Sequence, residues 1–208
     1  MNHSVQAHEH ELEHRDDFGA KLGMWLFLLT EILLFSGLFL SYSYMRARYP
    51  AEFHHAGSEM NAVLGVTNTL VLLTSSLTMA LAIVAIQRGE RKRAMAGVVA
   101  TIVLGVVFLV NKAFEWHAEI HHGNYPGSAH LATLPPGEQV FFGLYYTMTG
   151  LHGLHVLVGI SVLTVMAVMI KRGRINPDRF VTLENGGLYW HVVDVVWIFL
   201  LPLFYLAA

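Results

Sequence analysis

Residues 139–170 read QVFFGLYYTMTGLHGLHVLVGISVLTVMAVMI, a run without one Asp, Glu, Lys or Arg. A membrane-spanning helix needs roughly 20 apolar residues to cross about 30 Å of hydrocarbon. This stretch is therefore long enough to span a bilayer, and its extra length must tilt or project. Four further stretches also qualify, at about 22–45, 61–87, 95–116 and 187–206. The sequence predicts an all-α polytopic membrane protein with five transmembrane helices.

The overall composition supports this class and excludes others. Of the 208 residues, 54% are hydrophobic and only 13% are charged, whereas an average soluble domain is about a quarter charged. A net charge of −2 supplies no basic surface for nucleic acid, so we expect no such partner. The absence of cysteine excludes disulfides, cysteine-ligated iron–sulfur and zinc sites, and thiolate copper centres.

Lysine and arginine are unevenly divided between the two sides of the predicted helices. One side holds Arg15, Lys21, Arg88, Arg91, Lys92, Arg93, Lys171, Arg172, Arg174 and Arg179, and the other holds Arg46 and Arg48. Because positive charge stays inside, we predict a cytoplasmic N-terminus and a periplasmic C-terminus. Residues 1–20 form a polar, His-rich cytoplasmic tail whose first 17 residues are expected to be mobile. Residues 21–208 form the transmembrane domain.

Glu31 is the only acid in the first span, and an ionisable side chain at membrane depth is a functional candidate because it is costly. Its nearest charged neighbours in sequence are Lys21 and Arg46. Glu31 must therefore be protonated or meet a partner on another helix. A proton or lipid-headgroup contact is one reading, and a neutral acid hydrogen-bonded between helices is the other. The sequence leaves both open.

Other polar side chains within the spans come in pairs. Lys112 and Glu115 are three residues apart, which predicts an ion pair on one helix face, with a snorkelling lysine as the alternative. His191 and Asp194 have the same spacing, which predicts a carboxylate that orients an imidazole. His152 and His155 also share a helix face. Histidines on two helices would allow a bis-histidine haem, and hydrogen bonds between helices or to lipid are the other interpretation.

Histidines also gather in the connector after the third span. His117 and His121 are four residues apart, a spacing that can chelate a divalent metal if the helix continues. His122 and His130 lie close by, but the order is not the HExxH of metalloproteases. The favoured interpretation is that these histidines belong to a polar, solvent-exposed end of the third helix. We expect no metal site, and the chain has no motif of a catalytic centre of its own.

Small residues recur in 139–170, and they predict that neighbouring helices approach this span closely. They are Gly143, Thr147, Gly150, Gly153 and Gly159.

Two stretches carry a family resemblance: TGLHGLHVLVG at 149–159 and ENGGLYWHVVDVVWIFL at 184–200. Both closely resemble subunit III of the haem–copper terminal oxidases, in its short five-helix bacterial form. The motif residues are His152, His155, Trp190, His191, Asp194 and Trp197. Upstream, KLGMWLFLLTEILLFSGLF at 21–39 is similar to the family's helix with a buried glutamate, which places that glutamate at Glu31. The similarity runs from residue 18 to the C-terminus.

The resemblance implies a non-catalytic core subunit of a proton-pumping respiratory cytochrome c oxidase in the bacterial cytoplasmic membrane. Such a subunit stabilises subunit I, holds phospholipid and supports proton uptake. It binds no haem or copper itself, since both are expected on partner subunits. Subunit I is the expected direct partner and subunit II a further one, and a small subunit IV and a respiratory supercomplex stay open.

The resemblance also implies which residues serve these roles. Glu31 and His155 are carried over as residues that line a lipid cleft. His191 is added from the motif alone, and Arg172 is added as a nearby binder of lipid headgroups. Lys112 departs from the family pattern, in which a neutral or acidic residue is usual at this position.

Three other assignments stay open at this point. They are subunit III of a quinol oxidase, the related accessory protein of nitric oxide reductase and, more distantly, a b-type haem membrane electron carrier. The present sequence separates the oxidases poorly, because the discriminating dicopper ligands lie on subunit II.

Overall fold

The computed structural model describes the backbone of residues 2–206 and the side chains of residues 17–206. The elements are α1 (Asn2–Arg48), α2 (Pro50–Ser58), α3 (Ala62–Gln87), α4 (Arg91–His122), the 3-10 turn η1 (Leu131–Thr133), α5 (Pro136–Lys171), α6 (Val181–Leu201) and the π-helical η2 (Pro202–Leu206). Five helical segments are long and apolar enough to cross a membrane: Asp17–Arg48, Ala62–Gln87, Arg91–His122, Pro136–Lys171 and Val181–Leu206. The five predicted spans are therefore confirmed. Their orientation in the membrane stays a prediction.

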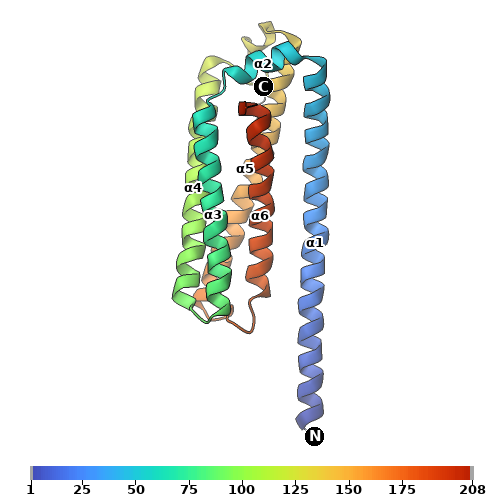
Figure 1. Ribbon diagram of the computed structural model, residues 1–208, viewed down its shortest axis with the longest axis vertical. Helices are drawn as coiled ribbons and strands as arrows, with labels where there is room; N and C mark the ends of the chain where they lie inside the picture. Colours follow the sequence, from blue (N-terminus) through green and yellow to red (C-terminus); the bar gives the residue numbers. More distant parts are fainter. Residues whose placement is uncertain (1, 207–208) are drawn as a thin grey trace.

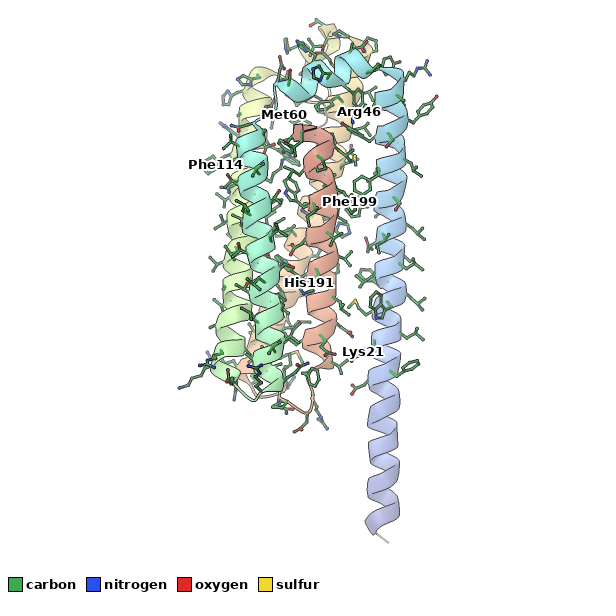
Figure 2. The ribbon with its side chains drawn as sticks, in the orientation of Figure 1. Lys21, Arg46, Met60, Phe114, His191 and Phe199 are labelled. Atoms are coloured by element: carbon green, nitrogen blue, oxygen red, sulfur yellow. The ribbon has the colours of Figure 1, made fainter. Side chains whose placement is uncertain are left out.

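Helices α3 to α6 form a bundle, and α1 stands beside it (Figure 1). Helix α1 contacts α5 and α6, its N-terminal part projects beyond the bundle, and α2 lies across the opposite end of the bundle. We call the end that holds the α3–α4 and α5–α6 connections the basic end, and the end that holds α2 and η2 the C-terminal end. Figure 2 shows Lys21 toward the basic end, and Arg46 and Met60 at the C-terminal end.

Helix α1 meets the bundle along one narrow seam. Within residues 17–48, its buried side chains are Leu28, Phe35 and Tyr42, which recur every seventh residue. Half-buried residues lie three or four positions from these, at Met24, Glu31, Leu38 and Met45. This is the spacing by which one helix lays a single stripe against its neighbours. Glu31 therefore sits within the seam, at a position where the pattern otherwise places apolar side chains.

Helix α1 begins at Asn2, so it runs back through the segment that the composition predicts to be a mobile tail. Glutamate, alanine, leucine and glutamine are good helix formers, and a helix adds residues more easily than it nucleates. The histidines of this segment, at positions 3, 8, 10 and 14, lie outside the residues whose side chains are described. The cytoplasmic location of the segment stays a prediction.

The short helix α2 occupies a connector in which Pro50 and Gly57 would be expected to break regular structure. Proline is the first residue of α2, where a missing N–H costs nothing. Phe53 of α2 is fully buried. Its ring centroid lies 5.4 Å from that of Tyr42 and 5.5 Å from that of Phe141. These edge-on aromatic contacts hold α2 across the ends of α1 and α5.

Trp190 of α6 is the side chain at which the four bundle helices meet. It is fully buried, and its indole Nε1 donates a hydrogen bond to Ser75 Oγ of α3 at 3.0 Å. A Cβ added at Gly105 of α4 would lie 2.7 Å from this indole, and one added at Gly159 of α5 would lie 2.8 Å from it. Glycine at these two positions therefore lets α4 and α5 close onto the ring. Close approach at Gly159 agrees with the small-residue pattern of the sequence.

We predict that Gly159→Ala lowers the stability of the bundle, because the new methyl group meets a rigid ring. Overpacking of this kind costs about 1–3 kcal/mol, measured as a lower midpoint of thermal unfolding in detergent. Gly143→Ala on the same helix is the matched control, since no described atom beyond its chain neighbours and its own helix backbone lies within 4 Å of its added Cβ. That variant should be neutral or slightly more stable. Equal losses in both variants would contradict this role of Trp190.

Candidate functional site

The structure brings Glu31 and His155 together at the contact between α1 and α5. Glu31 Oε2 lies 2.8 Å from His155 Nε2, and both side chains are largely buried, at 17% and 14% exposure. The other ring nitrogen, Nδ1, lies 2.8 Å from the backbone oxygen of Leu151. Glu31 therefore meets a partner on another helix, which was one of the two arrangements left open by the sequence.

The hydrogen bonds of His155 determine where protons can reside. A carbonyl oxygen only accepts, so Nδ1 must carry a proton toward Leu151. The contact between Nε2 and Glu31 then holds one further proton, located on either the imidazole or the carboxyl group. The pair is neutral overall in both cases, which suits membrane depth. It can pass that proton from one side chain to the other without changing its net charge.

Further polar contacts hold α1 against the bundle on either side of the Glu31–His155 pair along the helix. Toward the basic end, Lys21 Nζ lies 2.8 Å from Glu184 Oε2 of α6. Toward the C-terminal end, the Tyr42 hydroxyl donates to the backbone oxygen of Leu203. Polar contacts thus join α1 to the bundle near both ends of the bundle and in its middle.

Two cavities follow one another along the groove between α1 and α6, and the first of them is also walled by α3. The first, toward the basic end, measures about 440 Å³ and is lined by Lys21, Trp25, Ala80, Glu184, Leu188 and His191 among others. The second measures about 430 Å³ and is apolar, with Ile32, Phe35, Phe39, Val192, Val196 and Phe199 in its walls. Phe35 also contacts the His155 ring at 5.3 Å. The groove carries the polar side chains of Lys21, Glu184 and His191 at one end, and its walls are apolar farther along. An amphiphilic molecule has the same division into a polar and an apolar part.

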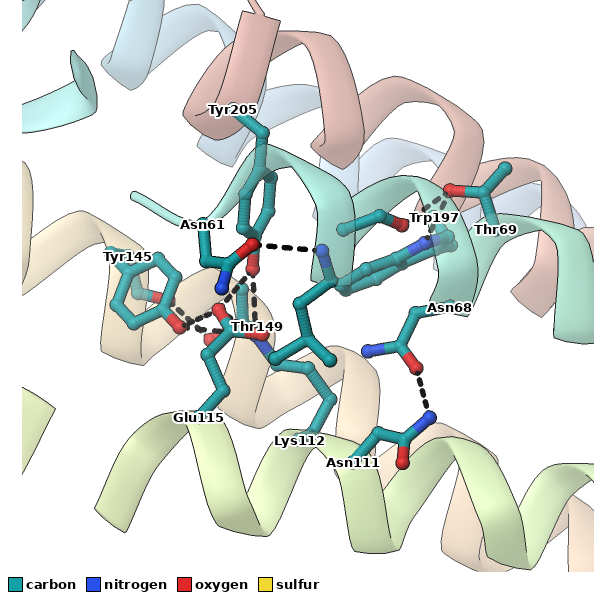
Figure 3. A network of polar contacts seen from close by, with 12 residues as sticks. Asn61, Asn68, Thr69, Asn111, Lys112, Glu115, Tyr145, Thr149, Trp197 and Tyr205 are labelled. Carbon is teal, nitrogen blue, oxygen red and sulfur yellow. Dashed lines mark hydrogen bonds and ion pairs between the residues drawn. The ribbon is translucent and has the colours of Figure 1, made fainter. Parts of the chain in front are cut away.

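Lys112 and Glu115 lie inside the bundle and form the ion pair that their spacing predicts, at 3.0 Å (Figure 3). Lys112 does not snorkel, since it is only 7% exposed. Its ammonium group also donates to the hydroxyls of Tyr145 at 3.1 Å and Tyr205 at 2.9 Å. Both hydroxyls in turn donate to Glu115 Oε1. All three ammonium protons thus have acceptors within the cluster.

Trp197 links this ion-pair cluster to the rest of the interior. Lys112 Nζ lies 5.3 Å from the centroid of the Trp197 ring, within the range of a cation–π contact. The indole N–H of Trp197 donates to Thr69 Oγ1 of α3 at 3.0 Å. The His152 ring lies beside the same indole, at 5.2 Å. Within residues 17–206, neither ring nitrogen of His152 has a hydrogen-bond partner.

His191 has a different partner from the one that its spacing predicts. Its Nδ1 lies 2.5 Å from Ser76 Oγ of α3. Asp194 is buried near the same serine, and no described donor reaches either carboxylate oxygen with good hydrogen-bond geometry. The predicted pairing of His191 with Asp194 is therefore wrong. A serine on the neighbouring helix orients the imidazole instead.

The remaining predicted site residues lie apart from Glu31. Arg172 is exposed just beyond the end of α5 at the basic end, and no described bond joins it to Glu31, His155 or His191. The three histidines within the spans have different neighbours: Glu31 for His155, aromatic rings for His152 and Ser76 for His191. Within residues 17–206, no three His, Asp or Glu side chains converge in a way that could hold a metal ion.

Sequence reasoning missed Ser76, Tyr145 and Tyr205, which complete the two buried sites. A single hydroxyl in an apolar helix is a weak signal, because it can bond to its own helix backbone. The span that contains Ser76 holds several such residues. Tyr205 could be placed only once η2 was known to turn its ring toward Lys112.

Comparison with known proteins gives one consistent family. The sequence profile of the cytochrome c oxidase subunit III family matches residues 4–208. Cytochrome c oxidase subunit 3 of Thermostichus vulcanus is 32% identical over 206 residues, which cover 96% of this chain and 90% of the relative. Cytochrome bo(3) ubiquinol oxidase subunit 3 of Pseudomonas aeruginosa is 32% identical over 215 residues, with 98% and 94% covered.

A longer relative joins two subunits in one chain. The heme-copper oxidase subunit I+III of Aeropyrum pernix is 27% identical over 189 residues. The match covers 88% of this chain but only 22% of that protein.

We predict that Glu115→Gln strongly destabilises the protein, because it leaves the Lys112 charge buried without a counterion. Breaking a buried pair from one side costs about 3–5 kcal/mol, measured by thermal unfolding in detergent. Replacing both charges, with Lys112→Met and Glu115→Gln together, should recover much of this loss.

The matched control is Glu90→Gln, which breaks an exposed pair with Arg93 at 2.7 Å. It should cost less than about 1 kcal/mol. If the Glu115 and Glu90 variants lost equal stability, the buried cluster would not have the structural role assigned to it.

Proposed function

Because this chain belongs to the cytochrome c oxidase subunit III family, we propose that it is the non-catalytic core subunit III of a proton-pumping respiratory cytochrome c oxidase. The family match over residues 4–208 carries this proposal, and the similarity to a cytochrome c oxidase subunit 3 over nearly its full length supports it. Haem and copper are held by partner subunits. The complex reduces O₂ to water in aerobic electron transport, and this chain contributes no catalytic centre.

A quinol oxidase is the second candidate for the complex. It is favoured by the relative from Pseudomonas aeruginosa, which is also 32% identical and is named as a ubiquinol oxidase subunit 3. The two assignments give this chain the same place in the assembly. They differ in the electron donor, which is received elsewhere in the complex.

Subunit I is the proposed direct partner, with subunit II as a further partner. The fused subunit I+III of Aeropyrum pernix supports direct contact, since two parts of one chain must fold within reach of each other. The N-terminus lies in the cytoplasm of a bacterium and the chain spans the cytoplasmic membrane. The concentration of Arg88, Arg91, Lys92 and Arg93 at the basic end supports that orientation.

Phospholipid is proposed to occupy the groove between α1 and α6. The apolar cavity beside Phe35 and Phe199 would take an acyl chain, and the cavity at Lys21 and His191 would take the polar headgroup. This places the headgroup at His191 and Lys21. Arg172 is a weaker candidate, because it lies beyond the end of α5.

Support of proton uptake is assigned to Glu31 and His155. They share one proton at membrane depth, they are partly exposed, and Phe35 connects them to the proposed lipid groove. The Lys112 cluster is a weaker candidate, because its ion pair is less exposed and the cavity that Lys112 lines lies between α4 and α5, away from the proposed lipid groove.

We predict that an affinity-tagged chain, extracted from its native membrane in mild detergent, co-purifies with haem-bearing subunit I and with subunit II. The complex should show haem bands in a reduced-minus-oxidised spectrum. The chain separated in harsher detergent should show none. Haem bands in the isolated chain would instead indicate a b-type electron carrier. Copper in the co-purified subunit II would distinguish a cytochrome c oxidase from a quinol oxidase.

We predict that Glu31→Gln leaves assembly intact but slows proton uptake or shortens the working lifetime of the oxidase. A glutamine amide can still donate to His155 Nε2, so the contact survives, but it cannot exchange a proton. Proton uptake and activity over many turnovers would be measured on the purified complex.

Glu59→Gln is the matched control, because Glu59 is exposed at the C-terminal end. It should behave like the parent complex. Unchanged proton uptake and lifetime in the assembled Glu31 variant would reduce Glu31 to a packing residue.

A further inference from the structure

The C-terminal end of the bundle carries most of the histidines whose side chains are described. They are His54, His55, His117, His121, His122 and His130. His117 and His121 differ from the rest because their rings lie against each other, with centroids 4.5 Å apart and planes at 67°. Both are exposed on the last two turns of α4. Nothing in the proposed function uses them.

The separation of these two rings matches what one metal ion would impose. An ion bound at about 2.0–2.1 Å from an imidazole nitrogen lies roughly 3.2 Å from the ring centroid. Two such rings that meet at about 90° have centroids about 4.5 Å apart, and at a tetrahedral angle about 5.2 Å apart. The observed centroid distance of 4.5 Å is that of an edge-on ring contact, and it also matches the spacing of two adjacent ligands on one ion. A small opening of the rings would reach the tetrahedral arrangement.

The C-terminal end of α4, which carries His117 and His121, is held in place by the residues that follow the helix. Helix α4 continues to His122, which meets the condition that the sequence set for chelation, and it stops at Gly123 with a left-handed φ of 82°. Asn124 donates its backbone N–H to the Glu119 backbone oxygen at 3.0 Å, and its side-chain amide donates to Glu119 Oε2 at 3.0 Å. The two imidazoles therefore stand on a turn that is fixed before any ion binds, which lowers the cost of binding.

We propose that His117 and His121 form a surface site for a divalent late transition metal ion: Cu²⁺, Ni²⁺ or Zn²⁺. Imidazole nitrogen suits these ions, whereas Mg²⁺ and Ca²⁺ prefer oxygen. Within residues 17–206 no third His, Asp or Glu converges on the pair, so water or a side chain from another subunit completes the coordination. The site is open and its ion exchanges with solution. This proposal departs from the expectation that the histidines form only a polar, solvent-exposed helix end without a metal site.

The test titrates Cu²⁺ into the purified full-length chain in detergent and follows it by electron paramagnetic resonance. The tail histidines at positions 3, 8, 10 and 14 are first replaced by alanine, because they could bind the same ion. The parent should bind one Cu²⁺ with two nitrogen ligands. Loss of a residue that only orients a ligand already weakens metal affinity about 10- to 100-fold. His117→Ala and His121→Ala should therefore each weaken binding by at least ~10-fold.

His122→Ala is the matched control, since it is exposed on the same turn but points about 100° away around the helix. It should bind Cu²⁺ like the parent. All three positions are exposed, so the variants should fold, which their unfolding midpoints without metal would check. Ni²⁺ should raise that midpoint in the parent and in the His122 variant, but not in the His121 variant.

Two results would overturn the site. One is Cu²⁺ affinity in the His117 or His121 variant equal to that of the parent. The other is an equal loss in the His122 variant, which would indicate a diffuse histidine surface.

Discussion

The contact between Glu31 and His155 places the first helix on the bundle. A carboxyl group at membrane depth has no water to bond, so it must find a partner inside the protein. His155 supplies that partner, and its own Nδ1 is fixed by the backbone of α5. The apolar seam through Leu28, Phe35 and Tyr42 is narrow and could slide or rotate. This polar contact fixes the register at membrane depth, together with the contacts of Lys21 and Tyr42 nearer the two ends of the bundle. The groove between α1 and α6 follows from that register.

The protein deals with buried polar groups in two different ways. Around Lys112, four side chains form a closed set in which each ammonium proton has an acceptor, deep between α4, α5 and η2. Such a set stabilises one arrangement of helices. Its charged side chains are almost fully buried, although Lys112 also lines a cavity between α4 and α5. The Glu31 pair lies at the edge of the bundle, partly exposed and beside a cavity. This difference in position, more than a difference in residue type, separates a structural cluster from a functional candidate.

Much of the fold could be predicted because its signals are local. The five spans follow from their length and lack of charge, and the Lys112–Glu115 pair follows from two positions on one helix. The sequence left Glu31 either protonated or paired with another helix, and the choice of His155 depends on which faces of α1 and α5 meet. The same limit explains the error at His191. Spacing along α6 favoured Asp194, whereas packing against α3 brought Ser76 closer to Nδ1.

The extra helical segments were hidden for physical reasons too. Helix α2 is short, and it depends on packing against the bundle, which includes the contacts of Phe53 with Tyr42 and Phe141. The extension of α1 to Asn2 has a polar sequence, so hydrophobic periodicity could not reveal it.

A double-mutant cycle on Glu31→Leu and His155→Leu, measured by thermal unfolding of the purified chain, tests the central claim most directly. Each single change should leave a polar partner without a bond at membrane depth, and the double change should cost little more than either one. The expected coupling free energy is about 1–3 kcal/mol. Additive losses, with a coupling below about 0.5 kcal/mol, would show that the two side chains act independently and would contradict the account.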